Sequence, residues 1–499
     1  MCIPKTFTLL WLAMVALAPV VAAQTSTPDI RPNFVWIIAD DMSLDTSVNG
    51  HKGVVTPNID QLASNGCRYL RAYATAPVCS SSRSAFILGC YQTTTGLHPH
   101  DAENPQPLPA PYQHLPSLLR QAGWFVTNSA APGALRSGRA ITKAKTHYNF
   151  SHDASTMYDG SEWRERKRGQ PFFAQFQISE PHRPFPIAEQ YDQKALAAIE
   201  LPPNYPDHPL MRRDWYAYLR SVEMVDRRVG AIIEQLREAG ELDNTVIMFF
   251  ADHGRPMPWG KQWLNVEGLH IPLIIRGPGI DAVSNENRLV SLIDLAPSML
   301  QLAGLAVPTW MEGKPILGGE FPVRHQIFAA RDRCGDAADR IRAIITPNYL
   351  MVHNFFPDVP RLNWSSYKES SYPGMPLLRV LDARQKLSPL QQLWLKPTRD
   401  EFELYDLPAD PLGIVNVANQ PENAVRLASL RETMDRWIQS SGDRGAAGDP
   451  STEPSITTIQ KDKRRDYQRV WSSRLKIEEP SDVERLEWWL KAYAVEEGE

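Results

Sequence analysis

The 499-residue chain contains only five cysteines. Cys2 lies in the N-terminal segment, which leaves Cys67, Cys79, Cys90 and Cys334 for the rest of the chain. Small proteins that depend on a disulfide framework carry far more cysteine for their length. The sequence therefore excludes a disulfide scaffold. It allows one bridge at most, for which Cys67 and Cys90 are the candidates.

The chain also has no strong net charge and, after its N-terminus, no long hydrophobic run. Its 53 Lys and Arg residues nearly balance its 57 Asp and Glu residues, which argues against a basic nucleic-acid-binding face. No later segment approaches the ~20 apolar residues that span a bilayer. We therefore expect neither a nucleic-acid partner nor a membrane span in the mature protein.

Residues 1–23 have the composition of a cleavable signal peptide. A short start with one lysine precedes an apolar stretch from Phe7 to Val21, and small residues follow. A membrane anchor is the weaker interpretation, because the stretch is short and Pro19 interrupts it. We predict export to the periplasm or the cell exterior, with the mature chain starting at Gln24.

Short apolar runs bounded by polar turns recur along the chain and predict buried strands. They are Asn33–Ala39, Trp124–Thr127, Phe172–Ile178, Val246–Ala251 and Ile271–Ile275. The clearest helix runs from about Arg213 to Ala239, with apolar residues at helical spacing and Gly240 to end it. Strands that alternate with helices predict an α/β fold with a mostly parallel, doubly wound sheet.

The pattern changes near residue 377, which divides the mature chain into a large domain over residues 24–376 and a smaller part. Two short segments, Leu377–Leu381 and Glu403–Leu407, and a helix from about Glu422 to Gln439 predict an α+β subdomain over residues 377–442. Residues 443–499 form a C-terminal extension with a peripheral helix near Val483–Ala494.

Acidic residues directly follow two of the predicted strands. Asp40 and Asp41 come after the first run, and Asp252 and His253 come after the fourth. Ligands of open α/β sheets bind beyond the carboxyl ends of the strands. Carboxylates gathered there repel each other unless a cation compensates, and their oxygens suit Ca²⁺ or Mg²⁺. We predict a divalent-metal site; acidic caps on the following turns would explain either pair alone.

A hydroxyl-rich turn precedes an apolar run at residues 79–89, Cys-Ser-Ser-Ser-Arg-Ser-Ala-Phe-Ile-Leu-Gly. A helix that starts near Ser81 would direct backbone N–H groups and the Arg83 side chain at an anion. Taken by itself, a serine-rich turn that caps a helix is the simpler explanation. The segment nevertheless resembles C-x-S-S-R-S-x-x-x-x-G, which is close to the signature of the formylglycine-dependent sulfatases of the alkaline phosphatase superfamily.

The resemblance extends from Arg-Pro-Asn-Phe at residue 31 to Glu-Leu-Tyr-Asp-Leu-x-x-Asp-Pro at residue 403. It is strongest to the heparan N-sulfatase-like and algal polysaccharide sulfatases. It implies an alkaline phosphatase-like fold, in which helices sandwich a large, mostly parallel sheet. It also implies that Cys79 is oxidised to formylglycine, also called 3-oxoalanine, and that residue 79 joins Asp40, Asp41, Asp252 and His253 as a metal ligand.

The same resemblance assigns sulfate-binding groups. Lys261, which follows the second acidic segment, and His182, in Pro-His-Arg-Pro, match family positions. Many sulfatases carry Gly-Lys-x-His just after the strand near Thr127, where this chain has Asn-Ser-Ala-Ala. A later Lys-Thr-His-Tyr-Asn resembles the Lys-Thr-x-Tyr-Asn element of glycan sulfatases, so we assign Lys145 and His147. Lys143, or an inserted loop, remains an alternative.

Ser81 departs from the family pattern, because this position is usually proline in substrates of the aerobic formylglycine-generating enzyme. An anaerobic radical maturase accepts more variation. The resemblance therefore implies one of these two maturation partners for Cys79 and does not choose between them.

The resemblance further implies how a sulfate ester would be hydrolysed. Arg83, Lys145 and Lys261, together with the metal, would neutralise the sulfuryl oxygens while a hydroxyl of the hydrated aldehyde attacks sulfur. His182, with Lys261, would protonate the leaving group, and His147 would take the proton of the second hydroxyl as sulfate leaves.

Four polar residues lie where related sulfatases contact a sugar: His98, His100, Arg331 and Arg333. Paired histidines and forked arginines suit the hydroxyls and acidic groups of a glycan, although surface-loop polarity explains each residue equally well. We predict a sulfatase that acts on a sulfated oligo- or polysaccharide, with O- and N-sulfate both open. The alternatives are a phosphodiesterase or phosphonate monoester hydrolase on the same scaffold and a non-catalytic glycan-binding homologue.

Overall fold

The computed structural model describes residue 1 and residues 31–102, 104–133, 135–136, 139–140, 144–283, 285–318, 322–443 and 456–495. The predicted signal peptide, its cleavage before Gln24 and the alternative Lys143 lie outside these residues. The chain from Pro32 onward forms one compact unit.

A large sheet forms the centre of this unit. Its seven strands, in the order β3-β6-β1-β7-β8-β2-β9, are parallel to their neighbours except for β8. The predicted α/β fold with a mostly parallel sheet is therefore confirmed. The strands are β1 (Asn33–Ala39), β2 (Cys67–Tyr73), β3 (Phe125–Ala130), β6 (Phe172–Ile178), β7 (Thr245–Ala251), β8 (Leu273–Arg276) and β9 (Glu286–Ser291).

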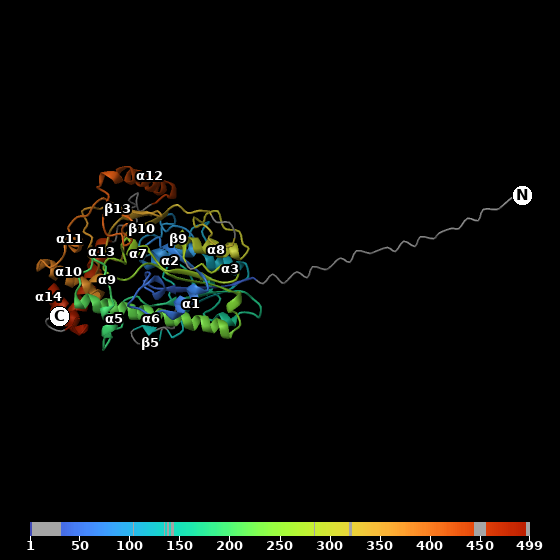
Figure 1. The fold of residues 1–499 in the computed structure, drawn as a ribbon, viewed down its shortest axis with the longest axis horizontal. Coiled ribbons are helices and arrows are strands. Elements are labelled where there is room, and N and C mark those ends of the chain that lie inside the picture. Colours follow the sequence, from blue (N-terminus) through green and yellow to red (C-terminus); the bar gives the residue numbers. More distant parts are fainter. Residues whose placement is uncertain are drawn as a thin grey trace. The chain divides into compact units, whose positions relative to one another are not determined.

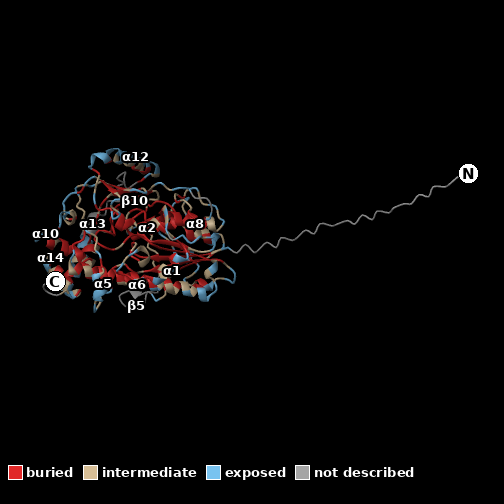
Figure 2. Cartoon of the chain, viewed as in Figure 1, coloured by how far each residue is buried: buried red, intermediate tan, exposed pale blue. Residues whose placement is uncertain are grey.

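Helices cover both faces of the large sheet (Figure 1). One face carries α1 (Pro57–Ser64) and the long α6 (Pro209–Glu238), and the other carries α2 (Cys79–Leu88), α3 (Leu115–Gln121) and α8 (Leu295–Leu302). Helix α6 begins earlier than the sequence predicts, because Pro209 occupies its first position and the His208 side chain accepts a hydrogen bond from Leu210 N–H. Figure 2 shows buried residues concentrated in the strands between these helices.

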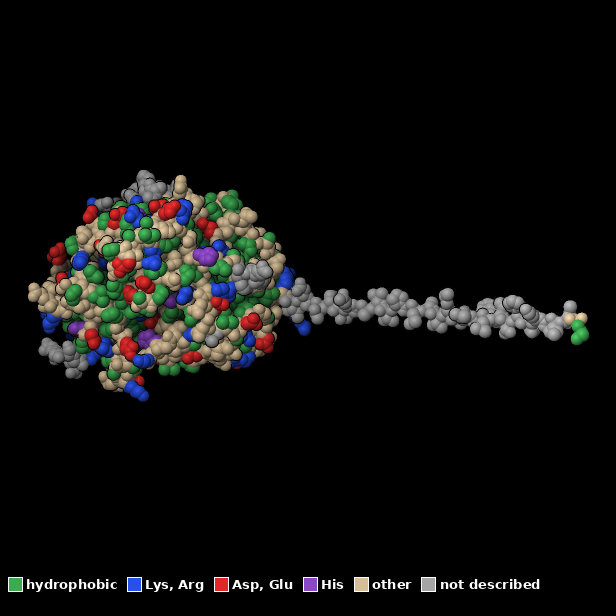
Figure 3. All heavy atoms as spheres, turned by 45° about the horizontal axis from the view of Figure 1, so that its top comes forward, with side chains coloured by type: hydrophobic (Ala, Val, Ile, Leu, Met, Phe, Trp, Pro, Cys, Tyr) green, Lys and Arg blue, Asp and Glu red, His purple; other side chains and the backbone are tan. Residues whose placement is uncertain are grey.

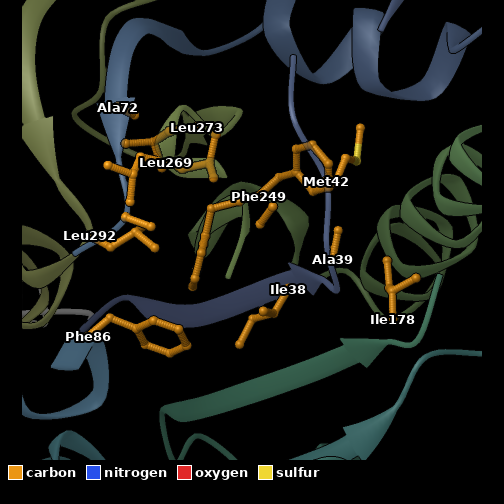
Figure 4. Packing of buried hydrophobic residues seen from close by; sticks show 14 of the residues in the cluster. Ile38, Ala39, Met42, Ala72, Phe86, Ile178, Phe249, Leu269, Leu273 and Leu292 are labelled. Carbon is orange, nitrogen blue, oxygen red and sulfur yellow. The ribbon is translucent and has the colours of Figure 1, made fainter. Parts of the chain in front are cut away.

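The central strand β1 is buried along its whole length. The Trp36 ring meets Phe86, Phe173 and Phe250 edge-on at centroid distances of 5.7, 5.2 and 5.4 Å, a preferred aromatic geometry. Figure 4 shows Phe86 of α2 packed beside this strand. The end of β1 is therefore held by packing on both faces, which fixes the positions of the residues that follow it.

A second, antiparallel sheet has the order β10-β11-β12-β13. Its strands are β10 (Ile327–Arg331), β11 (Ile341–Ile345), β12 (Tyr349–Asn354) and β13 (Phe402–Asp406). Helix α12 (Ala424–Ser441) covers it, with the Trp437 ring stacked on Phe328 at 4.5 Å. Three of these strands precede residue 377, and Leu377–Leu381 lies in helix α10 (Gly374–Ala383).

Two helices of the C-terminal extension pack on the main body. Helix α13 (Ile456–Leu475) contacts α9 (Ser366–Ser371), and α14 (Asp482–Ala492) contacts α10. Within the described part of the chain, no helix combines the length and apolar composition needed to cross a membrane. Shorter elements complete the fold: β4 (Leu135–Arg136), β5 (Arg139–Ala140), α4 (Ala154–Met157), α5 (Gln193–Ala197), α7 (Val266–Leu269), α11 (Pro389–Gln392) and five short 3-10 helices.

The candidate disulfide between Cys67 and Cys90 is not formed, so that prediction is wrong. Cys67, Cys79, Cys90 and Cys334 are all free and buried in the described structure. Cys90 follows α2 and its thiol donates to the Trp310 carbonyl at 3.2 Å, whereas Cys67 begins β2 opposite Ile275. The two side chains are thus held by separate elements. Packing, without disulfides, stabilises this part of the fold.

The surface carries charges of both signs. On the face drawn in Figure 3, basic and acidic side chains are interspersed and neither sign forms an extended patch. This distribution agrees with the near balance of basic and acidic residues in the sequence.

Candidate active site

The register of three parallel strands brings separate segments of the chain together. At the end of β1, Ala39 lies opposite Ile178 of β6 and Ala251 of β7. The three strands therefore end at one edge, and the residues after each strand meet there. Four predicted metal ligands are among them: Asp40 and Asp41 follow β1, and Asp252 and His253 follow β7.

The carboxylates at this edge form a buried cluster. His253 Nε2 lies 3.0 Å from Asp41 Oδ1, and the Asp41 N–H donates to Asp252 Oδ1 at 3.0 Å. One ligand atom from each of Asp41, Cys79, Asp252 and His253 lies within 4.8 Å of the others, and Asp40 and Asp41 form an overlapping group with His182. Buried carboxylates and an imidazole suit a hard divalent cation, so these residues fit Ca²⁺ or Mg²⁺.

Only glycine fits sterically at position 254, directly after His253. A Cβ atom at Gly254 would lie 1.9 Å from the Glu267 carbonyl oxygen, so the backbone could not approach this closely with any side chain. The Gly254 N–H donates to the Gly268 carbonyl, and His253 Nδ1 lies 3.0 Å from the Gly254 carbonyl. This close approach holds the His253 ring with Nε2 toward the carboxylates.

A basic side chain faces each of the three carboxylates. Lys145 Nζ lies 2.7 Å from Asp40, Lys261 Nζ lies 2.8 Å from Asp41, and Arg83 Nε lies 2.8 Å from Asp252. Burial alone would raise the pKa of Asp40 and Asp41, but the facing cations hold both below the usual value. Burial outweighs Arg83 at Asp252 and raises the pKa of that carboxyl to about 6.

Cys79 is the first residue of α2 and only 2% exposed. Its Sγ lies 3.3 Å from His253 Nε2 and 3.5 Å from Lys261 Nζ. Burial would raise the pKa of the thiol, but the charges of Lys145, Lys261 and His253 lower it well below its usual value. The helix N-terminus adds partial positive charge at the same point. The site thus stabilises negative charge on the group at position 79.

His147 lies in a chain of hydrogen-bonding groups. Its Nε2 is 2.5 Å from Asp101 Oδ1, and the other oxygen of Asp101 is 3.1 Å from His100 Nδ1. Burial lowers the pKa of His147, but Asp101 and Cys79 together outweigh burial and raise that pKa to about 9. Sequence reasoning missed Asp101; its place directly after two paired histidines was the available signal.

His182 approaches the carboxylates from the loop after β6. Its Nδ1 lies 2.6 Å from the Arg183 carbonyl, which acts as an acceptor, so Nε2 is the nitrogen directed at Asp41, 3.9 Å away. Arg183 pairs with Asp214 through both of its terminal nitrogens, at 2.8 and 2.5 Å, and fixes the loop. Burial lowers the pKa of His182, which favours its neutral form.

A cavity of about 450 Å³ opens onto these groups. Cys79, Lys145, His147, His182 and Lys261 line it together with further residues. The walls include His100, Asp101, Asp336, Ser365, Ser366, Tyr367, Lys463, Asp466, Tyr467 and Val470. A volume of this size falls in the range of small-ligand sites.

The predicted sugar contacts divide into two groups. His100 lines the cavity, but His98, Arg331 and Arg333 do not belong to its lining. His98 and Arg331 are buried, 2% and 1% exposed, and Arg331 pairs with Asp339 at 3.1 Å. Arg333 donates to the Asp101 carbonyl at 3.2 Å. In this structure these three side chains support the walls, whereas His100 reaches the interior.

Two further residues, which sequence reasoning missed, complete the site. Gln177 of β6 accepts a hydrogen bond from Arg83 at 2.8 Å and so orients the guanidinium. The Tyr367 ring lies 5.1 Å from Lys261 Nζ and forms part of the cavity wall. No motif marks either position, because both depend on contacts between distant parts of the chain.

The site therefore indicates a class of enzyme. Buried oxygen ligands for a divalent metal, a deprotonation-prone residue at a helix N-terminus and three converging cations suit hydrolysis of an anionic ester by a covalent mechanism. The arrangement stands at the carboxyl edge of an α/β sheet, where such sites lie.

Comparison with known proteins identifies the family. The sulfatase family profile matches residues 32–305, more than half of the chain, and the chain belongs to the sulfatase family. It is 30% identical to an ulvan-active sulfatase of Formosa agariphila, over 85% of this chain and 77% of that protein. It is 24% identical to human N-sulphoglucosamine sulphohydrolase, over 82% of this chain and 90% of that protein.

Solved structures agree in fold. A protein solved with its substrate D-glucosamine-2-N,6-O-disulfate has a TM-score of 0.59 at 19% identity and covers 85% of this chain and 100% of its own. A phosphonate monoester hydrolase of Silicibacter pomeroyi also has a TM-score of 0.59 at 19% identity, over 83% of this chain and 96% of its own. At these identities the likeness concerns the fold alone.

Proposed function

We propose that this protein is an exported sulfatase that removes sulfate from a sulfated saccharide by means of a formylglycine made from Cys79. The observation that carries the proposal is the environment of Cys79, which begins α2 beside three carboxylates and three basic side chains. Family membership supports the reaction class. Relatives named for ulvan and for N-sulphoglucosamine support a saccharide substrate.

Two groups would complete the site. A Ca²⁺ or Mg²⁺ ion, held by Asp40, Asp41, Asp252, His253 and residue 79, would neutralise negative charge on the sulfate. Formylglycine would supply, in its hydrated form, one hydroxyl that attacks sulfur and a second whose deprotonation releases sulfate. Both the formylglycine-generating enzyme and a radical maturase are candidate partners for the oxidation.

The chain's own residues then take separate roles. Lys145, Lys261 and Arg83 would hold the sulfate oxygens in place of the carboxylates that they now face. His182 directs Nε2 into the site, where it would take up a proton and, as the imidazolium, deliver that proton to the leaving group. His147, in its neutral form, would accept the proton of the second hydroxyl, and Asp101 would stabilise the charged imidazole that results.

Replacement of Asp101 by asparagine is expected to lower kcat by about 10²-fold, the lower end of what a positioned acid or base contributes. The amide would remove the negative charge that stabilises protonated His147 while keeping a similar shape. KM should change little, because Asp101 acts on the proton acceptor. Steady-state kinetics on a sulfated saccharide would measure both constants.

Asp466→Asn provides the matched control for Asp101→Asn. Asp466 also lines the cavity, but its carboxylate pairs with Arg469 at 3.5 Å. We expect its kcat to stay near that of the wild type. A kcat for Asp101→Asn equal to that of Asp466→Asn would remove Asp101 from the reaction.

A phosphodiesterase or phosphonate monoester hydrolase is the second candidate, because a hydrolase of that type shares the fold. Paired nitrophenyl esters separate the two candidates. We expect the wild-type protein to hydrolyse nitrophenyl sulfate faster than nitrophenyl methylphosphonate and bis-nitrophenyl phosphate, with sulfated disaccharides as better substrates still. Faster turnover of the phosphorus esters would replace the proposed function with the second one.

A further inference from the structure

One face of α13 forms part of the cavity wall. Lys463, Asp466, Tyr467 and Val470 line the cavity, and their spacing of three, one and three residues places them on a single side of the helix. The sequence identified residues 443–499 only as an extension. The structure makes this extension a part of the site.

Contacts on both sides of this face hold α13 in place. Trp471 is fully buried, and its indole N–H donates to the Glu369 carbonyl at 3.3 Å. Arg474 donates to the Ser370 carbonyl at 2.9 Å, and the Tyr467 ring meets Trp364 edge-on at 5.5 Å. The two hydrogen bonds tie α13 to α9, which also contributes residues to the cavity lining.

On the cavity-facing side of α13, the ammonium group of Lys463 is available to bind an anionic ligand. Asp466 pairs with Arg469, and Asp336 accepts hydrogen bonds from the Ser366 N–H and hydroxyl at 3.1 Å. Among the described residues, no hydrogen bond or ion pair is made by the Lys463 ammonium. Burial raises the pKa of Asp336, and the nearby charge of Lys463 opposes that rise. Lys463 is exposed and free to turn toward a ligand.

We propose that the cavity-facing side of α13 is a second anion-binding subsite, in which Lys463 binds a carboxylate or a further sulfate of the saccharide. The inference rests on the proposed function, because the scissile sulfate would occupy the end of the cavity at Cys79. Tyr367 and Tyr467 also line the cavity and offer aromatic surface against which the apolar side of a sugar ring would pack. The preferred substrate is then a saccharide with a second acidic group.

Binding to protein with Cys79→Ala tests this subsite without turnover. The probes are a sulfated disaccharide that contains a uronic acid and the same disaccharide with its carboxylate reduced to an alcohol. In this background, Lys463→Gln is expected to weaken binding of the uronate probe roughly tenfold, the size of one charge-assisted hydrogen bond. Binding of the reduced probe should change by less than about twofold. Titration calorimetry measures each Kd.

Lys461→Gln is the matched control, because Lys461 lies on the same helix, is exposed and does not line the cavity. It should leave both Kd values unchanged, and Lys463→Arg should retain tight binding of the uronate probe. Three results would overturn the subsite. The Cys79→Ala protein that keeps Lys463 could bind both probes with equal affinity, or it could bind neither probe. Lys463→Gln could also weaken binding of both probes equally. Absence of sulfate release by the wild type, with the Kd pattern intact, would overturn the proposed function alone.

Discussion

Cys79→Ala is expected to abolish sulfate release, with a fall in kcat of at least about 10³-fold, because the side chain that becomes the nucleophile is gone. The other four metal ligands and the three basic side chains remain, so binding of a sulfated saccharide should persist. Sulfate release from a defined disaccharide, measured in a single-turnover experiment, would quantify the loss.

Cys334→Ala is the matched control for this experiment, because Cys334 is also free, buried and part of the cavity lining. It should retain activity near the wild-type level. The mass of the wild-type peptide that contains residue 79 is the second readout, since replacement of the thiol by an aldehyde makes the peptide lighter. An unmodified thiol in protein from the native host, or full activity in Cys79→Ala, would contradict the mechanism and favour a glycan-binding role.

Removal of the divalent metal is expected to lower activity by at least about 10²-fold and to lower the Tm, with both restored by Ca²⁺. The carboxylates of Asp40, Asp41 and Asp252 are buried and close together, so an ion that binds only the folded state stabilises it. When the free Ca²⁺ concentration is a hundred times the Kd, binding raises the free energy of unfolding by about 2.7 kcal/mol. Activity and thermal unfolding with and without a chelator would measure both effects.

Asp41→Asn should remove the response of Tm to Ca²⁺, because it replaces a carboxylate that contacts His253 with a neutral amide. Asp45→Asn serves as the control. Asp45 is buried nearby but accepts a hydrogen bond from Tyr218 and pairs with Arg255, outside the metal-ligand groups. It should keep the Ca²⁺ response. A chelator that changes neither activity nor Tm would rule out the metal.

Local patterns predicted the elements that place the site. Strands β1 and β6 have the predicted bounds, and β7 differs by one residue, because their continuous apolar runs are typical of buried parallel strands. Asp40, Asp41, Asp252 and His253 could be grouped from sequence, because residues after neighbouring parallel strands must meet. Resemblance to a family supplied Lys145 and His147, which no local rule would have chosen.

Long-range packing explains what sequence reasoning missed. Asp101 gains its role from His147, which lies 46 residues along the chain, and α13 is held beside the cavity by contacts with α9 and α14. His98 and Arg331 are polar residues in a suitable part of the chain, but tertiary contacts bury both. The apolar segment Leu377–Leu381 is helical because it belongs to α10, whose apolar side packs against α14. Such short runs do not distinguish a strand from a helix.

The depth of Cys79 would set the order of events if this residue is oxidised as we propose. A side chain that is 2% exposed, at the buried start of α2, offers no surface to another enzyme once the sheet and helices have assembled. In the proposed function, a maturase would have to act while the segment around residue 79 is still extended. Oxidation would precede folding, and a chain that folds first would keep its thiol permanently.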